Sequence, residues 1–413
     1  MKLTGSRPVA RAERLPHGTD PLGGRWPDGG FFFRAPDRAI AAVGAARTIT
    51  VPAGPGQVGR AAALAREVLG ELAHPVGGPR PFVVGALPFD GMTPAALVVP
   101  RVGVVTGPGG SAWRITVDAD DGPDPAAAGP SRAQPGSGAG PPPLEVSPVP
   151  ERAAYLEAVS EARRRIRAGR LEKVVLARML VVRAGHDLDR AALLRRLLRA
   201  EPNAYVFGVH GFVGASPELL VARTGRTVEA NPLAGTAIRS ADAASDAAAA
   251  DGLRRSEKDL AEHAPVVQAV REGLEPVCDE LAVDEWPEVI GTARLWHLST
   301  MVRGTLRRPA PSVLELAARL HPTPAVCGTP REAAMAAIGE LERIDRTLYA
   351  GLVGWTDTEG DGQWAVALRC AEVQGRIALL FAGAGIVADS DPEAELAETD
   401  AKFRSMLDAL GYG

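Results

Sequence analysis

The sequence predicts an α+β fold built on an antiparallel or mixed β-sheet. The chain has 413 residues and 46% of them are hydrophobic, which is enough for a sizeable core. Strand-like segments come in groups and not in strict alternation with helices, which argues against a doubly wound parallel sheet. A stretch rich in proline, glycine and alanine, residues 118–150, separates a strand-rich amino-terminal part, 1–117, from a mixed helix and strand region, 151–413.

The amino-terminal part contains short apolar runs separated by turns, which is typical of strands. Strands are expected at 30–34, 81–89, 97–105 and 113–117. Residues Gly107–Gly110 predict a hairpin turn and not a phosphate loop, because no GK[ST] follows them. Residues 118–150 hold almost no large apolar side chains and cannot offset their ordering entropy, so a disordered linker or loop is expected there.

The carboxy-terminal region begins with a helix over 151–168, which Gly169 ends. A continuous β-branched strand, Lys173–Val182, follows it. The last helix has Ser390 and Glu393 at the spacing of a capping box, with Asp391 as the other candidate N-cap. Further strands are expected at 204–210, 219–223, 293–303, 363–371 and 376–382, and further helices at 256–277, 312–320, 331–343 and 392–410.

Composition excludes several classes of function. Basic and acidic residues, 46 and 50 in number, are scattered, so no nucleic-acid surface or anionic-membrane surface is expected. The longest apolar run, Ile377–Ala388, is shorter than the roughly 18–20 residues of a membrane span. The three cysteines are far apart and predict no disulfide framework. No apolar signal segment opens the chain, so a cytoplasmic protein with a small-molecule ligand is expected.

Two isolated charged residues suggest proton transfer. Lys173 lies in an apolar strand, where a buried lysine loses its proton easily and can act as a general base. Glu218 follows Pro217 beside an apolar run, where poor solvation raises the pKa of a carboxyl group and lets it donate a proton. Taken alone, these residues are more simply interpreted as an edge-strand lysine and an exposed turn glutamate.

Acidic residues on two helices suggest a metal. Glu262 lies in SEKDLAEH, and Glu395, Glu398 and Lys402 share one face of the last helix. Carboxylates brought together by a fold suit Mg2+, which takes hard oxygen ligands and shares its shell with an anionic substrate. The structural alternatives are a helix-terminal salt bridge and a solvated charged face.

Other positions suggest ligand contacts. Alternation along 364–371 predicts that Arg369 stands on a face of alanines, with room for a carboxylate to reach its guanidinium, although a packed helix would use the same space. The small residues Gly383 and Gly385 permit a ligand to approach the backbone. His297, in an alternating strand, is by itself expected to be a core histidine.

These segments occur together and in order, and with them the chain resembles the chorismate-utilising enzymes, the isochorismate, salicylate, anthranilate and aminodeoxychorismate synthases. The resemblance covers most of the chain after Glu151. The segments are KVVLAR from Lys173, GASPELL from Gly214, PLAGTAIR from Pro232, SEKDLAEH from Ser256, HLSTMVRG from His297, HPTPAVCGTP from His321, YAGLVGW from Tyr349, WAVALRCA from Trp364 and AGAGIVADSDPEAELAET from Ala382.

The resemblance implies a single large domain of the chorismate-binding fold, with sheets flanked by helices and the active site between them. It implies that Lys173 is the general base, Glu218 the general acid, and Glu262 and Glu398, with Glu395 close by, the ligands of Mg2+. The implied chorismate-binding residues are Tyr349, Arg369, Gly383, Gly385, His297, Lys402, Gly235 and Thr236.

The branch implied is isochorismate synthase. Ammonia-using members typically carry glutamine where this chain has Lys173, and the segment FVVGALPFDG from Phe82 resembles isochorismate synthases of siderophore pathways. Salicylate synthase, which also expels pyruvate, and a non-catalytic chorismate-binding protein remain the alternatives. Val326, Cys327 and Pro265 depart from the family pattern. A monomer is expected, and siderophore, menaquinone or specialised-metabolite pathways all fit.

Overall fold

The computed structural model describes residues 9–22, 29–74, 78–118 and 145–412. Among these residues, 19 strands join into one hydrogen-bonded sheet and three more form a small separate sheet. Every strand pair in both sheets is antiparallel, which confirms the predicted α+β class. No helix in these ranges is long and apolar enough to cross a membrane.

The strands of the large sheet are β1 (Ala10–Arg14), β2 (Phe31–Ala35), β3 (Arg38–Val51), β4 (Phe82–Leu87), β5 (Ala95–Thr106), β6 (Ala112–Val117), β7 (Glu145–Val149), β8 (Lys173–Arg183), β9 (Tyr205–Val209), β10 (Phe212–Ser216), β11 (Leu219–Thr224), β12 (Thr227–Asn231), β14 (Cys278–Val283), β17 (Val302–Leu306), β18 (Gly328–Thr329), β19 (Leu352–Asp357), β20 (Gly362–Val366), β21 (Cys370–Gln374) and β22 (Ile377–Ile386). The small sheet contains β13 (Leu233–Ile238), β15 (Glu288–Gly291) and β16 (Leu295–Ser299). The helices are α1 (Gln57–Gly70), α2 (Arg152–Arg167), α3 (Arg190–Ala200), α4 (Ala243–Arg255), α5 (Glu257–Leu274), α6 (Val313–Leu320), α7 (Arg331–Leu341) and α8 (Pro392–Leu410).

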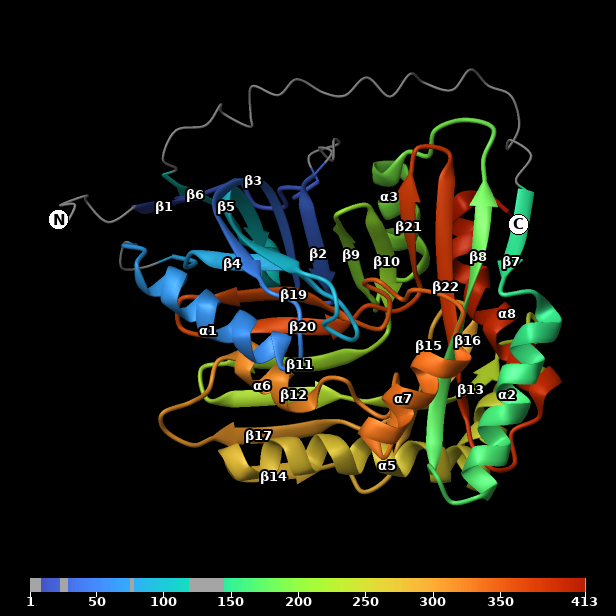
Figure 1. The fold of residues 1–413 in the computed structure, drawn as a ribbon. Coiled ribbons are helices and arrows are strands. Elements are labelled where there is room, and N and C mark those ends of the chain that lie inside the picture. The colour runs from blue at the N-terminus through green and yellow to red at the C-terminus, as the bar shows by residue number, and fades with distance from the viewer. Residues whose placement is uncertain (1–8, 23–28, 75–77, 119–144, 413) are drawn as a thin grey trace.

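The large sheet consists of two strand sets that meet at β5. The first set runs β14–β17–β12–β11–β20–β19–β4, and the second runs β3–β2–β9–β10–β21–β22–β8–β7. In Figure 1 strands β11, β12, β19 and β20 lie across the view, whereas β8, β21 and β22 stand upright. The chain passes from one set to the other between β10 and β11, and again between β20 and β21. These two crossings position the site described below.

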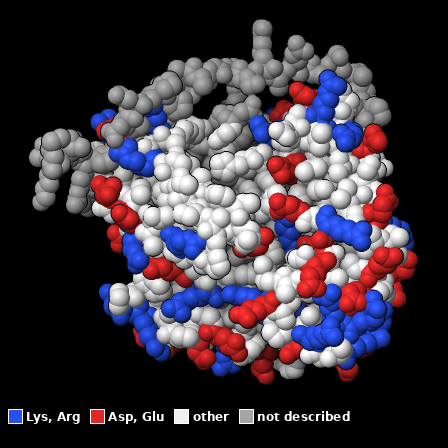
Figure 2. Space-filling model, in the orientation of Figure 1, with Lys and Arg blue, Asp and Glu red and all other residues white. Residues whose placement is uncertain are grey.

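Helices cover both sets through apolar faces. Helices α2 and α8 lie together beside the long pair β8 and β22, and α5 runs along the end of the first set near β14 (Figure 1). Helix α2 buries Tyr155, Val159, Ala162 and Ile166, the stripe that the sequence predicts. Lysines and arginines are intermingled with acidic residues on the face drawn in Figure 2, in keeping with the scattered charges of the sequence.

Several expected elements differ in the structure. Strand β3 and helices α1 and α3 were not predicted, and the strand predicted over 293–303 is divided into β16 and β17. Most of the predicted linker, 119–144, lies outside the described residues, but Glu145–Val149 at its end form β7, which pairs with β8. The predicted capping box is wrong: Asp391 is the N-cap of α8 and accepts from the Ala394 amide, while Ser390 Oγ accepts from the Val387 amide.

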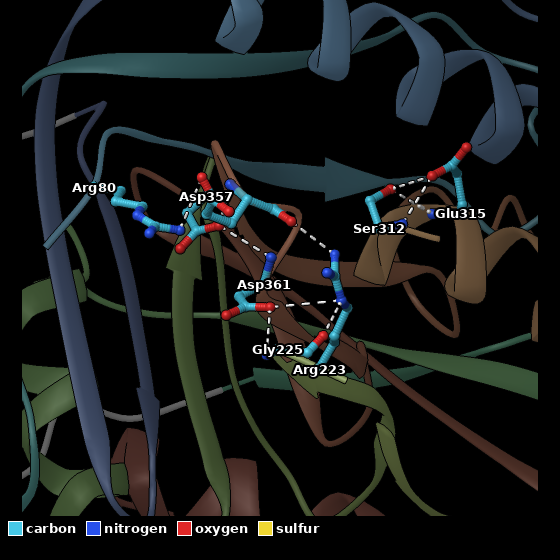
Figure 3. Close-up of polar contacts among 8 residues, drawn as sticks. Arg80, Arg223, Gly225, Ser312, Glu315, Asp357 and Asp361 are labelled. Carbon is cyan, nitrogen blue, oxygen red and sulfur yellow. Dashed lines mark hydrogen bonds and ion pairs between the residues drawn. The ribbon is translucent and has the colours of Figure 1, made fainter. Parts of the chain in front are cut away.

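The turn between β19 and β20 is fixed by polar contacts (Figure 3). The Arg223 guanidinium donates to the carbonyls of Gly225 and Glu359, each at 2.8 Å. Asp361 accepts from the Gly225 amide at 2.8 Å, and Asp357 accepts from the amides of Glu359 and Asp361. This turn lies at the ends of β11, β19 and β20 that are opposite the two crossings.

Candidate active site

The two crossings between the strand sets bring Glu218 and Arg369 side by side. Glu218 lies between β10 and β11, and its carbonyl accepts from the Val366 amide at 3.2 Å. Arg369 lies between β20 and β21, and its carbonyl accepts from the Ala215 amide at 3.1 Å. The continuous strand expected over 363–371 is therefore wrong, because the chain breaks at Ala367–Arg369. Arg369 lies in this break with a φ of 47°, an uncommon conformation for a residue with a side chain.

Glu218 has the environment of a proton donor. Its side chain is buried, with 2% of the residue exposed. Burial raises the pKa of Glu218 to about 8, although the positive charges of Lys173, Arg369 and Lys402 oppose the shift. The carboxyl group therefore keeps its proton at neutral pH.

Lys173 and Glu262 form a buried ion pair. Lys173, the first residue of β8, places Nζ 3.0 Å from Oε1 of Glu262 on α5. Burial alone would raise the pKa of Glu262, but the ammonium of Lys173 and the neighbouring lysines outweigh it and lower that pKa. A Cβ on Gly385 of β22 would clash with Glu262 Oε1, so a side chain there would displace the pair.

Helix α8 presents two further carboxylates. Lys402 Nζ lies 2.5 Å from Glu398 Oε1 and donates to the Gly383 carbonyl at 2.8 Å. Glu395 is almost fully buried, and Lys258 Nζ of α5 lies 3.5 Å from its Oε1. Burial, followed by the negative charge of Glu398, raises the pKa of Glu395 to about 7. Each of these carboxylates thus has one lysine beside it.

The donor set fits a magnesium ion by its chemistry. Within the described ranges, no three His, Cys, Asp or Glu side chains are arranged around one point as a preformed metal cage. However, Glu262, Glu395 and Glu398 are hard oxygen donors whose charges act on one another, and Oε1 of Glu395 is buried with no hydrogen-bond partner. A buried carboxylate oxygen that accepts no hydrogen bond and lies among like charges, with the Lys258 ammonium 3.5 Å away, is an environment that a divalent cation stabilises.

Arg369 is linked to the small sheet through His297. Arg369 Nη2 lies 3.1 Å from His297 Nε2, and a guanidinium can only donate, so Nε2 is the acceptor. The ring proton is then on Nδ1, which is 3.2 Å from the Gly235 carbonyl and 3.3 Å from Thr236 Oγ1. Burial, followed by the charge of Arg369, holds the pKa of His297 well below its usual value, which keeps this ring neutral.

Tyr349 lies against strand β22 at the site. Its ring stacks on Phe381 of β22 with centroids 5.5 Å apart, and its hydroxyl would be 3.0 Å from a Cβ on Gly383. Gly383 therefore allows the phenol to lie against the strand. Burial raises the pKa of Tyr349, so its hydroxyl remains a hydrogen-bond donor.

Two residues near the site were not singled out from the sequence. His263 is buried, with Nε2 2.7 Å from Thr300 Oγ1 and Nδ1 without a partner. The other is Lys258, which precedes Glu262 by four residues, a spacing that puts both side chains on one face of α5. That spacing could have identified Lys258 as a neighbour of the carboxylates.

The positions that depart from the family pattern lie in ordered structure. Val326 and Cys327 are buried, and the Val326 carbonyl accepts from Arg346 Nη1 at 2.8 Å. Burial raises the pKa of Cys327 to about 11, which leaves it an unreactive thiol. Helix α5 continues through Pro265.

A surface cavity of about 340 Å³ lies elsewhere. Its lining comes from the ends of α3 and α8 and from residues before β16, among them Arg199, Glu201 and Arg294, and contains none of the predicted site residues. The buried cluster around Lys173, Glu218 and Arg369 is therefore the better candidate for chemistry.

Known proteins resemble this chain over most of its length. Residues 131–411 match a family model described as chorismate binding enzyme. Isochorismate synthase DhbC of Bacillus subtilis is 40% identical over 97% of this chain and 96% of its own. The vibriobactin-specific isochorismate synthase of Vibrio cholerae is 39% identical over 80% of each chain. A crystal structure of DhbC from Bacillus anthracis superposes with a TM-score of 0.80 at 41% identity, covering 94% of this chain and 98% of that one.

Proposed function

The chain belongs to the chorismate-binding enzyme family, and on that premise we propose that it is an isochorismate synthase, an isomerase that converts chorismate to isochorismate. The observation that carries the proposal is the pair of proton-transfer groups in one buried site. Glu218 holds a proton at neutral pH, while Lys173 lies within its electrostatic reach. An isomerisation that adds water at one carbon and removes a hydroxyl at another needs one group of each kind.

In this mechanism the two groups act on opposite sides of the substrate ring. Lys173, when neutral, takes a proton from water as the oxygen of that water bonds to C2, and both ring double bonds shift, from C1=C2 to C1=C6 and from C5=C6 to C4=C5. The C4–O bond breaks as Glu218 gives its proton to the departing hydroxyl, which leaves as water. One water enters and one leaves, so the net reaction is an isomerisation. Each group contributes about 10²–10⁴-fold in rate.

The remaining residues bind and orient the substrate. We assign Arg369 and Tyr349 to the enolpyruvyl carboxylate; a guanidinium held by His297 and a protonated phenol support this assignment. Backbone N–H groups around Gly383 and Gly385 would assist them, and Gly383 lies against the Tyr349 hydroxyl. His297 and Lys402, with Gly235 and Thr236, would line the side of the ring carboxylate.

Glu262, Glu398 and Glu395 would hold Mg2+, which when bound supplies a positive charge for the ring carboxylate. Those three carboxylates, with the Glu395 oxygen that accepts no hydrogen bond, support this assignment. We also infer a monomeric cytoplasmic enzyme, and light scattering in solution should give the mass of one chain.

The test is incubation of the purified protein with chorismate and Mg2+, followed by chromatographic separation of products. Isochorismate is expected without added ammonia. Anthranilate formed only with ammonia, or no turnover at all, would contradict the proposal. Stoichiometric pyruvate in the same assay would identify a salicylate synthase instead.

A further inference from the structure

The two helices that carry the proposed metal ligands are bridged by a lysine. Lys258 lies in the first turns of α5, one turn before Glu262, and its Nζ is 3.5 Å from Glu395 Oε1 on α8. Glu262, Asp259 and Glu398 also act electrostatically on its ammonium group. Lys258 therefore stands between the same two helices that a bound cation would join.

The three lysines beside the carboxylates differ in their access to water. The side chain of Lys173 is 3% exposed and that of Lys402 is 13% exposed, whereas that of Lys258 is 49% exposed. A buried ammonium cannot leave its carboxylate without a large desolvation cost. Lys258 can move its ammonium into solvent, because half of its flexible side chain already lies there.

We propose that Lys258 is the resident counter-ion of the metal site. Its ammonium neutralises Glu395 and joins α5 to α8 when no metal is bound, and it withdraws into solvent when Mg2+ takes that position. Lys258 thereby weakens the affinity of the site for Mg2+ and stabilises the metal-free form. This inference rests on the proposed function only in its assignment of Glu262, Glu395 and Glu398 as metal ligands.

The experiment is calorimetric titration of Mg2+ into the chorismate-free protein at low ionic strength. Removing one competing positive charge should make Lys258→Gln bind Mg2+ about three- to tenfold more tightly than the wild type. Lys258→Arg keeps the charge and should bind like the wild type. The matched control is Arg152→Gln, which removes an exposed partner of Glu393 on the same helix α8 and should leave the affinity unchanged.

A second measurement is the thermal midpoint with and without Mg2+. The midpoint of metal-free Lys258→Gln should fall below that of the wild type, and saturating Mg2+ should remove the difference. Unchanged or weaker Mg2+ binding by Lys258→Gln, or no Mg2+ binding by either protein, overturns the proposal. Chorismate turnover by the wild type is assayed separately, so a protein that binds Mg2+ as described without forming isochorismate would refute the function and not the role of Lys258.

Discussion

Two buried clusters of opposite charges contact β8 and are built differently. In one, Arg346 donates to both oxygens of Glu342 and to the carbonyls of Val175 and Val326, while Glu342 also accepts from the Ala177 amide. In the other, Lys173 and Glu262 have one ion-pair contact, and Oε1 of the neighbouring Glu395 has an ion-pair contact with Lys258 but accepts no hydrogen bond.

The difference indicates that the Arg346 cluster is structural and that the Lys173 cluster is functional. The Arg346–Glu342 pair is extensively hydrogen-bonded within the protein and holds β8 to the loop around Val326. The partly satisfied lysine and glutamate pairs leave donors and acceptors that a substrate or cation can use, at a cost in stability. The following variants test this comparison.

The largest effect is expected for Glu218→Gln, which removes the proposed acid and keeps the shape of its side chain. The turnover number should fall about 10²–10⁴-fold. Because the folded pKa, about 8, exceeds that of the unfolded chain, ionisation of Glu218 opposes folding increasingly as pH rises from about 4 to 8. The variant should therefore be at least as stable as the wild type at pH 8 and equal to it near pH 4, as measured by urea unfolding. If Glu218→Gln turned over chorismate at the wild-type rate, Glu218 would not be the general acid.

The Arg346→Met variant should have the largest effect on stability. It leaves the carboxylate of Glu342 buried without its partner, which should lower the free energy of unfolding by about 3–5 kcal/mol. Chemical denaturation measures this loss. Replacing both partners, with Glu342→Leu added, should recover part of it, whereas a loss below about 1 kcal/mol would show that the cluster is not structural.

A smaller effect is expected in the pH dependence of kcat/KM, which also distinguishes the two clusters. Glu218 must be protonated to act, so kcat/KM should fall about tenfold per pH unit above pH 8. The Arg346 cluster has no role in proton transfer and predicts no such limb. The residual activity of Glu218→Gln should lack the alkaline decline, and a wild-type profile that stays flat to pH 9.5 would contradict the assignment.

The sequence predicted the α+β class and most elements of the carboxy-terminal region, because their apolar patterns are long and regular. It did not predict that Arg369 lies at a chain crossing, since alternation describes strands and cannot locate a break with positive φ. It placed Lys402 on the helix face of Glu398 but did not predict the lysines beside Glu262 and Glu395. Those two pairs, Lys173 with Glu262 and Lys258 with Glu395, form between elements distant in the chain and depend on tertiary packing.

The smallest effect is expected at the turn between β19 and β20, far from both clusters. Burial, followed by the charge of Asp361, raises the pKa of Asp357 to about 6 (Figure 3). Because this folded pKa is above the unfolded value, ionisation of Asp357 lowers stability as pH rises from about 4 to 6, and the cost persists above pH 6. Asp357→Asn keeps an oxygen that accepts from the Glu359 and Asp361 amides. The free energy of unfolding of this variant should therefore exceed that of the wild type by about 1–2 kcal/mol at pH 8 and equal it near pH 4. Urea unfolding at the two pH values measures this gain. Chorismate turnover should not change, because the turn is at the opposite strand ends from Glu218, and a loss of turnover would show that the site depends on more of the sheet than its crossings.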